Sequence, residues 1–296
     1  MDNIKCKDIS KRYGSNEVLK NINLELEQGK IYGLIGRNGA GKTTLLSIMS
    51  AQNPASSGEV MLGSQKVWEN PKALSHICFS RELNPITGNG ANNMKVKEYL
   101  RIASVYYPDW DRKMAEKLVE IFELDIKKPV SKLSKGMMSM ITIIVAMASK
   151  ADFTFLDEPV AGLDVVAREL FYKLLLEEYT QTGRTFVIST HVIDEASDIF
   201  EEVVIINNKE IMIKENTAQL LARAVHVSGR AEVVDVAIKG LNVYHEENIG
   251  RSKGATVLLN EGQHISGSSE LSVQPLTLQN LFVALCGKEA SLHDRI

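Results

Sequence analysis

The chain has 296 residues, which is long enough for one large domain or for two unequal ones. Hydrophobic residues make up 44% and charged residues 24% of it, a composition that excludes disordered and fibrous proteins. The formal net charge of -3, without any block of Lys and Arg, gives no electrostatic basis for binding nucleic acid.

Cysteine content and apolar runs point to a reducing compartment and away from a membrane span. Cys6, Cys78 and Cys286 are odd in number and far apart, unlike a disulfide framework or a metal-ligand cluster. The first residues lack the apolar core of a signal peptide, and the longest apolar run, 137–148, is shorter than the roughly 20 residues that span a bilayer. We therefore expect a chain that is soluble by itself and reaches a membrane only through a partner.

The N-terminal part alternates apolar and polar residues over Ile4–Ile9 and Ile22–Leu26, which predicts half-buried strands. Tyr13 lies in the turn region between them, shortly before a glycine-rich loop. Its ring can stack on a nucleotide base, but the residues alone favour a half-exposed structural tyrosine.

The stretch Gly36–Thr44 fits the pattern G-x-x-x-x-G-K-[ST] without a mismatch. An apolar run, Ile31–Ile35, precedes it as a buried strand would, and apolar residues at helical spacing follow it. In that context the loop N–H groups bind phosphate oxygens, Lys42 pairs with the β- and γ-phosphates, and the Thr43 hydroxyl coordinates Mg²⁺. An ordinary tight turn explains the Lys-Thr pair poorly. The nucleotide-binding residues expected here are Gly36, Asn38, Gly39, Ala40, Gly41, Lys42, Thr43 and Thr44.

The middle of the chain is predicted to be a helical insertion into an α/β domain. Apolar residues recur at helical spacing over 94–124, and the helical region as a whole is expected at about 88–150. Ser134 and Gly136 then open an apolar helix. This is a second place where phosphate can dock, although an ordinary helix cap is the more economical interpretation of these two residues taken alone.

Two further buried strands end in polar residues. Phe153–Glu158 releases two carboxylates, of which Asp157 would hold Mg²⁺ and Glu158 would polarise an attacking water. Thr185–Thr190 is expected to run parallel to it and ends at His191. A histidine in that place faces the same crevice, so a structural and a functional role are equally open.

The C-terminal part carries no constellation typical of a site. Glu202–Asn207 and Glu210–Ile213 predict a hairpin, and Val225–Ile238 and Ala255–Asn260 are strand-like. The helical spacing of 276–285 closes the chain. We expect residues 218–296 to form a small α+β appendage after a domain that covers residues 1–217.

The order of these motifs resembles the nucleotide-binding subunit of ATP-binding-cassette (ABC) transporters over Ile4–Lys214. Tyr13 is similar to the aromatic A-loop that stacks on adenine, and Gly36–Thr44 to the Walker A motif. Residues 133–137, Leu-Ser-Lys-Gly-Met, are similar to the signature motif.

The Walker B motif of the family matches Phe153–Glu158, with Glu158 as the catalytic glutamate. Residues 161–164 resemble the D-loop, which makes Asp164 a nucleotide-site residue, and His191 resembles the switch histidine. The resemblance therefore implies functional roles for Tyr13, Ser134 and His191.

The resemblance implies a P-loop NTPase fold of the ABC type, with an antiparallel β subdomain, a helical subdomain and the α+β appendage. It also implies ATP and Mg²⁺ as ligands and ATP hydrolysis as the activity. Two such subunits, identical or related, pair head to tail, and the signature of one caps the ATP held by the other. Separately encoded transmembrane permease subunits carry the transport path, so the chain is expected at the cytoplasmic face of a bacterial cell membrane.

Two departures from the family pattern concern the phosphate end of this site. Glu82 occupies the place of the Q-loop glutamine, which touches Mg²⁺ and the membrane partner, and a carboxylate there adds negative charge near the metal. In the signature, Lys135 replaces the first of two glycines and Met137 replaces a glutamine. Ser134 and Gly136 are retained, so we expect hydrolysis to survive.

The whole chain looks most like ATPase subunits of bacterial ABC-2-type exporters, including the motif at 107–111, Tyr-Pro-Asp-Trp-Asp, and the closing segment 278–283. Two alternatives stay open. One is a non-transport ABC ATPase that acts on ribosomes or DNA, although the chain shows one cassette, no sustained heptads and no basic face. The other is a nucleotide-gated regulatory module with little turnover, which Glu158 disfavours and Glu82 leaves open.

Overall fold

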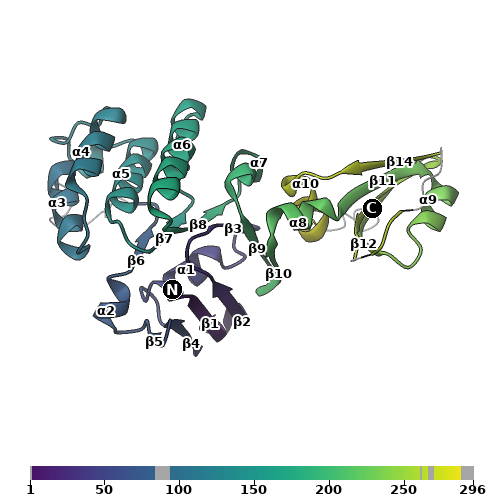
Figure 1. The fold of residues 1–296 in the computed structure, drawn as a ribbon, viewed down its shortest axis with the longest axis horizontal. Helices are drawn as coiled ribbons and strands as arrows, with labels where there is room; N and C mark the ends of the chain where they lie inside the picture. The colour runs from purple at the N-terminus through teal and green to yellow at the C-terminus, as the bar shows by residue number, and fades with distance from the viewer. Residues whose placement is uncertain (1, 84–93, 261, 266–269, 288–296) are drawn as a thin grey trace. The chain divides into compact units, whose positions relative to one another are not determined.

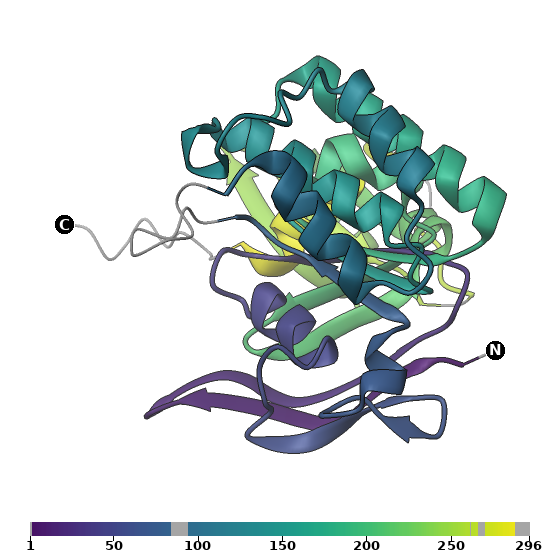
Figure 2. The ribbon, with the colours of Figure 1, turned by 90° about the vertical axis from the view of Figure 1, so that its left-hand side faces the viewer.

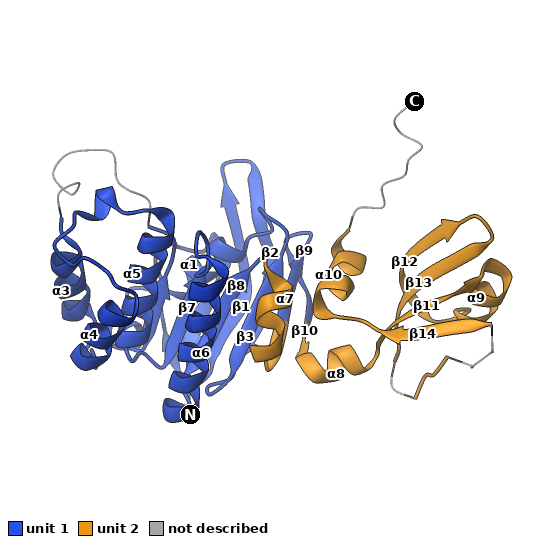
Figure 3. Ribbon diagram, turned by 90° about the horizontal axis from the view of Figure 1, so that it is seen from above, with its two compact units in different colours: residues 1–191, 204–213 blue, residues 192–203, 214–296 orange. Residues whose placement is uncertain are grey.

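The computed structural model describes residues 2–83, 94–260, 262–265 and 270–287. The chain divides into two compact units, residues 1–191 with 204–213 and residues 192–203 with 214–296 (Figure 3). The expected boundary between residues 217 and 218 stays a prediction. Residues 88–93 of the expected helical region lie outside the described residues.

The first unit begins with a small antiparallel sheet in the order β2-β1-β4-β5. Ile4, Cys6 and Ile9 of β1 are buried, as expected when one face of a sheet meets the core, and the spacing changes after Cys6 because the pairing with β2 shifts in register there. This sheet confirms the expected antiparallel subdomain. Its strands are β1 (Ile4–Tyr13), β2 (Asn16–Leu26), β4 (Ser57–Leu62) and β5 (Gln65–Lys66).

The larger sheet has six strands in the order β10-β9-β3-β8-β7-β6, and β3, β8, β7 and β6 pair in parallel (Figure 1). Every residue of β3, β7 and β8 is buried, as parallel strands covered on both faces require. Because β3, β8 and β7 run in parallel, their carboxyl ends lie together along one side of the sheet, which is called its carboxyl edge below. The strands are β3 (Ile31–Gly36), β6 (Ile77–Ser80), β7 (Phe153–Asp157), β8 (Thr185–Thr190), β9 (Glu202–Asn207) and β10 (Glu210–Asn216).

Helix α1 (Lys42–Met49) lies between the two sheets of the first unit (Figure 2). Its buried Leu45 and Leu46 share one core with Ile9 of the small sheet and Leu34 and Phe155 of the large one. Because α1 packs against both sheets, its first residue and the glycine-rich loop before it have a fixed position between them. The short helix α2 (Pro71–Leu74) follows β5.

The remaining helices of the first unit form one group, in which α5 packs against α3, α4 and α6 (Figure 1). Side chains of Asp111, Ser134 and Asp164 cap the N-termini of α4, α5 and α6. Among the described residues, no helix combines the length and the hydropathy that crossing a bilayer requires. The elements are α3 (Val96–Tyr106), α4 (Arg112–Ile121), η2 (Val130–Lys132), α5 (Lys135–Ala148) and α6 (Val165–Thr182).

The second unit contains a four-stranded antiparallel sheet in the order β12-β13-β11-β14, as expected for an α+β appendage. Val234 of α9 packs on one face of it, against Val227, Ala255 and Val257. The elements are α7 (Ile193–Ala196), η3 (Ser197–Ile199), α8 (Thr217–Ala222), β11 (Ala224–Arg230), α9 (Ala231–Ala237), β12 (Asn242–Ile249), β13 (Ser252–Leu258), β14 (Leu271–Pro275) and α10 (Leu278–Cys286).

The strand-like run expected over Val225–Ile238 is wrong in its second half. Strand β11 ends at Arg230, and residues 231–237 are helical. Val234 and Ile238, four residues apart, are both buried on the sheet, so one helical face supplies the core contact. The β-branched composition of the segment concealed this spacing, because tertiary packing outweighs a weak local propensity.

Candidate functional site

The glycine-rich loop joins β3 to α1 at the carboxyl edge of the large sheet. Gly39 and Gly41 have φ angles of 79° and 105°, which side chains rarely tolerate. A Cβ on Gly41 would lie 2.6 Å from Cδ2 of Leu19, so the glycine is needed for space as well as for conformation. The loop backbone thus turns tightly above the start of α1, where N–H groups without helical partners meet the positive end of the helix dipole.

Lys42, the first residue of α1, is 7% exposed and lies at the centre of the site. Its Nζ donates to the carbonyl oxygens of Gly36 at 2.7 Å and Arg37 at 3.4 Å. It also lies 4.0 Å from Oε1 of Glu158. Burial lowers the pKa of Lys42, and the nearby carboxylates of Glu158 and Asp157 oppose that shift. A buried ammonium whose hydrogen bonds go to carbonyl oxygens is suited to exchange them for an anion.

The two acids after β7 are held by β8. Asp157 is the last residue of β7, and its Oδ1 accepts a hydrogen bond of 2.5 Å from the hydroxyl of Ser189. The N–H of Glu158 donates to both the carbonyl and the hydroxyl oxygen of Ser189, each at 3.1 Å. Glu158 also has a φ of 49°, so the chain turns sharply between the two carboxylates.

His191 contacts Glu158 directly. Its Nδ1 lies 2.6 Å from Oε2 of Glu158, and because a carboxylate can only accept, Nδ1 carries the proton in this contact. The structure therefore brings Lys42, Asp157, Glu158 and His191, four residues singled out in the sequence, into one cluster.

Ser189 is the member of this cluster that the sequence did not reveal. It is fully buried in β8 and pairs in register with Asp157. The sequence held one indication of this role: Ser189 is a polar residue within a largely apolar strand, two positions before the candidate histidine His191. Its meaning depends on the register of two strands that are distant in the sequence.

Ser134, Gly136 and Asp164 form a second group, at the start of α5 and α6. The Ser134 hydroxyl oxygen accepts from the N–H of Met137 at 3.2 Å, and Asp164 caps α6 in the same way. A Cβ on Gly136 would lie 2.5 Å from the carbonyl oxygen of Gly162, so the signature-like and D-loop-like segments are in close backbone contact. These contacts leave the hydroxyl proton of Ser134 available to a ligand.

Tyr13 and Glu82 lie at two other places in the first unit. Tyr13 ends β1 with half of its surface exposed, and its hydroxyl accepts from Nδ2 of Asn53, which follows α1. The Nζ of Lys11 lies 4.9 Å from the centre of the Tyr13 ring. Glu82 follows β6, and its Oε1 lies 3.1 Å from Nζ of Lys135. In this structure the Glu82 carboxylate is thus paired with the signature-like segment.

The residues present fit a magnesium nucleotide. The glycine cradle, the Lys42 ammonium and the exposed Thr43 hydroxyl at the start of α1 meet the needs of phosphate oxygens and a hard cation. Within the described part of the chain there is no group of three or more His, Cys, Asp or Glu placed to hold a metal. Mg²⁺ takes most of its ligands from phosphate and water and one or two from protein.

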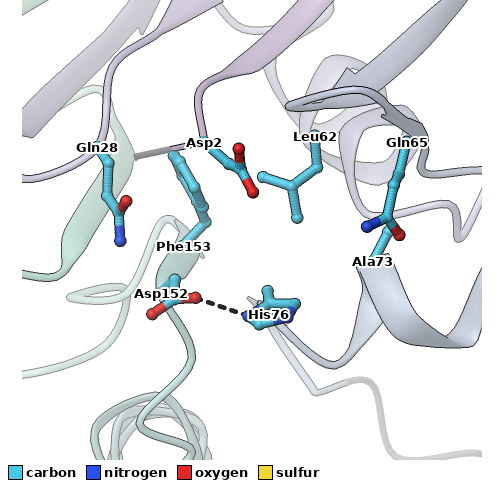
Figure 4. Close-up of a pocket in the computed structure, with 8 residues that line it drawn as sticks. All are labelled: Asp2, Gln28, Leu62, Gln65, Ala73, His76, Asp152 and Phe153. Carbon is cyan, nitrogen blue, oxygen red and sulfur yellow. Dashed lines mark hydrogen bonds and ion pairs between the residues drawn. The ribbon is translucent and has the colours of Figure 1, made fainter.

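A separate pocket lies at the amino end of β7, where Phe153 begins the strand that Asp157 ends (Figure 4). Its volume is about 240 Å³, and it contains a hydrogen bond of 2.7 Å between Nδ1 of His76 and Oδ2 of Asp152. None of the residues predicted for the nucleotide site lines it. The contact joins a histidine Nδ1 to a carboxylate oxygen, as the contact between His191 and Glu158 does, so His76 offers a control for His191.

Comparison with known proteins identifies the family. The family model described as ABC transporter matches residues 19–161. The Bacillus subtilis "ABC transporter ATP-binding protein YtrB" is 24% identical over 290 residues, which cover 96% of this chain and 98% of that protein. The "Nod factor export ATP-binding protein I" of Cupriavidus metallidurans is 30% identical over 209 residues, covering 69% of this chain and 68% of that one.

A solved structure shares the fold. It is a dimeric post-hydrolysis state of the ATP-binding cassette MJ0796 bound to ADP and Pi, with a TM-score of 0.62 and 23% identity over 72% of this chain and 98% of that one. The chain therefore belongs to the ABC transporter family, as one of its ATP-binding proteins, the ATPases of these systems.

Proposed function

We propose that this ATPase binds MgATP at the glycine-rich loop and hydrolyses it with Glu158. One observation carries the proposal: Lys42, Asp157, Glu158 and His191 meet at the carboxyl edge of three parallel strands. This edge is where α/β proteins bind nucleotides. The loop residues 36–44 hold the phosphates, and Tyr13 stacks on the base.

The residues of the cluster have separable roles in this proposal. Lys42 leaves the carbonyl oxygens of Gly36 and Arg37 and binds phosphate oxygens, while Thr43 and Asp157 hold Mg²⁺. The metal neutralises charge on the phosphates when bound. Glu158 accepts a hydrogen bond from the attacking water, and the N–H of His191 keeps its carboxylate in place. Glu82 is a further proposed metal ligand, once it is free of Lys135.

A head-to-tail dimer completes the proposed site. Ser134 and Gly136 form a group separate from the Lys42 cluster: Ser134 caps the N-terminus of α5 and offers its hydroxyl, and Gly136 in the first turn offers its backbone N–H. We propose that they bind the phosphates of ATP held by a second ABC ATPase subunit, identical or related, and that Asp164 lies at the same interface. The relative MJ0796 is dimeric with ADP and Pi, which supports this assembly.

A groove beside β6 offers a place for a membrane partner. Its volume is about 370 Å³, and it is lined by residues of β6, α3 and α5, including Phe79, Tyr99 and Tyr106, and by Arg81, which follows β6. Tyr106 is 73% exposed. An exposed aromatic at the rim of an apolar groove suits a helical segment of another protein. We propose that a separately encoded permease subunit docks here and keeps the ATPase at the cytoplasmic face of a bacterial membrane.

Export is the proposed direction of transport. The relative from Cupriavidus metallidurans is an export ATP-binding protein, and 96% of the chain aligns with an ABC transporter ATP-binding protein of Bacillus subtilis. The second unit has no cluster assigned to chemistry, and we propose that it supports dimerisation or regulation. Deleting residues 218–296 tests this: unchanged dimerisation and ATPase activity would count against it.

The test of hydrolysis is Glu158→Gln, which keeps the size of the side chain and removes its negative charge. We expect nucleotide binding to remain, steady-state ATPase activity to fall by at least about 100-fold, and a MgATP-dependent dimer to accumulate in size-exclusion chromatography. Equal hydrolysis by the variant and the parent would show that the catalytic role of Glu158 is wrong. Equal lack of hydrolysis would favour a regulatory nucleotide-binding module.

The test of the partner is affinity purification of this subunit from native membranes in mild detergent, with mass spectrometry of the bound proteins. A stoichiometric multi-span protein is expected, and a second cassette chain would show a heterodimer. Recovery of ribosomal proteins or nucleic acid without a membrane protein would contradict the transporter role.

A further inference from the structure

Lys135 occupies a position with an unusual set of contacts. It is the first residue of α5, between Ser134 and Gly136, and its Nζ lies 3.1 Å from Oε1 of Glu82. The side chains of Lys135 and Glu82 are 55% and 44% exposed. Two of the three residues that depart from the ABC pattern in these segments, Lys135 and Glu82 but not Met137, are thus ion-paired with each other.

The stem of Lys135 is held in place while its end is free to move. A Cβ on Gly162 would lie 3.1 Å from Cβ and 2.8 Å from Cγ of Lys135, and a Cβ on Gly136 would meet the carbonyl oxygen of Gly162 at 2.5 Å. The backbone around residue 135 is therefore closely packed on the loop before α6. Only the outer methylenes and the ammonium can change partner.

We propose that Lys135 binds phosphate oxygens of the ATP held by the partner subunit, and that Glu82 holds the Lys135 ammonium while the subunits are apart. This inference rests on the proposed head-to-tail dimer and deepens it. The first turn of α5 contains no acidic residue, and its N-terminus favours an anion. Lys135 adds a full positive charge to the donors of Ser134 and Gly136 at the place where the partner's phosphates are expected.

Exchange of the two anions is physically easy. Exposed ion pairs contribute little to stability, so releasing Glu82 has a small cost. A triphosphate carries more charge than one carboxylate and is desolvated when the subunits close, so it is the stronger partner. The Lys135 ammonium therefore stays with Glu82 in the free subunit and moves to the partner's ATP when the subunits close.

The experiment measures ATP-dependent dimerisation by analytical ultracentrifugation in the Glu158→Gln background. Lys135→Gln is expected to weaken the MgATP dimer by about tenfold, the loss of one charge-assisted hydrogen bond. Lys135→Arg keeps the charge and is expected to restore most of the affinity. Lys117→Gln, which removes an exposed lysine of α4, is the matched control and is expected to change nothing.

Nucleotide binding to the dilute monomer separates this role from a structural one. Because Lys135 acts on the partner's ATP, Lys135→Gln is expected to leave binding of a fluorescent ATP analogue to the monomer unchanged. A loss of monomer binding equal to the loss of dimer affinity would contradict the proposal.

Glu82→Gln tests the other half of the pair. Glu82→Gln frees Lys135 but also removes a proposed metal ligand, so the double variant carries the test: Lys135→Gln is expected to weaken the dimer more in a Glu82→Gln chain than in the parent. Independent, additive effects would show that the pair does not exchange. If Lys135→Gln leaves the affinity of the MgATP dimer unchanged, this inference alone is overturned. If the Glu158→Gln chain does not dimerise with MgATP, the proposed dimer is overturned and this inference with it.

Discussion

The hydroxyl of Ser189 donates a hydrogen bond of 2.5 Å to Oδ1 of Asp157, across a register pair of β8 and β7. The same hydroxyl oxygen accepts the N–H of Glu158. One buried serine thus orients the proposed metal ligand and the proposed catalytic carboxylate together. A group that hydrogen-bonds a metal ligand fixes the orientation of that ligand towards the metal.

Ser189→Ala is expected to lower ATPase activity by about tenfold and to raise the Mg²⁺ concentration needed for half-maximal rate. The free energy of unfolding is expected to fall by about 1–2 kcal/mol, because Glu158 keeps the carbonyl of Ser189 as an acceptor while Asp157 loses a donor. Mg²⁺ titrations of initial rate and urea denaturation measure the two effects. Ser149→Ala, which removes another buried hydroxyl, at the end of α5, is the control and is expected to leave the Mg²⁺ dependence unchanged.

His191→Ala is expected to reduce kcat by about 100-fold with little change in KM for ATP, because the imidazole holds Glu158 and not the nucleotide. Steady-state kinetics measure both constants. His76→Ala removes the similar pair with Asp152 at the other end of β7 and is expected to leave kcat unchanged (Figure 4). Equal losses in the two variants would show a general effect on the fold.

Gly136→Ala is expected to separate ATP binding from turnover. The new Cβ would meet the carbonyl oxygen of Gly162 at 2.5 Å, so the start of α5 must move from the loop before α6. Overpacking of this kind costs about 1–3 kcal/mol of stability. Equilibrium binding of ATP to the monomer should persist, because the loop at Gly41 and Lys42 is untouched, while ATPase activity falls. Unchanged activity and an unchanged Tm would contradict the contact between these two segments.

Stability is expected to decline at alkaline pH because of Cys6. Burial raises the pKa of the Cys6 thiol from 9.0 to about 12, so the folded chain keeps a proton that the unfolded chain loses. The thiol contribution is therefore complete below pH 9 and falls by about 1.4 kcal/mol per pH unit as the pH rises towards 12. Urea denaturation of the parent and of Cys6→Ala at several pH values measures the difference. A difference that is independent of pH would contradict this origin.

The sequence by itself located the parts of the site that are consecutive along the chain. A glycine loop between a strand and a helix needs only local geometry, so Gly41 and Lys42 could be assigned without any long-range contact. An apolar strand that ends in Asp157 and Glu158 is equally local, and parallel pairing with the strand before His191 followed from the α/β pattern. The structure confirms these strands and the close approach of His191 to Glu158.

Only the tertiary structure decided how residues that are distant in the sequence combine. The role of Ser189 follows from the register of β7 and β8, and the Glu82–Lys135 pair from the packing of α5 beside the end of β6. Likewise the helix α9 forms where β-branched residues favoured a strand, because its face at Val234 fills the core of the second unit. Register and packing depend on many weak contacts summed over the whole fold, and no local stretch of sequence contains that sum.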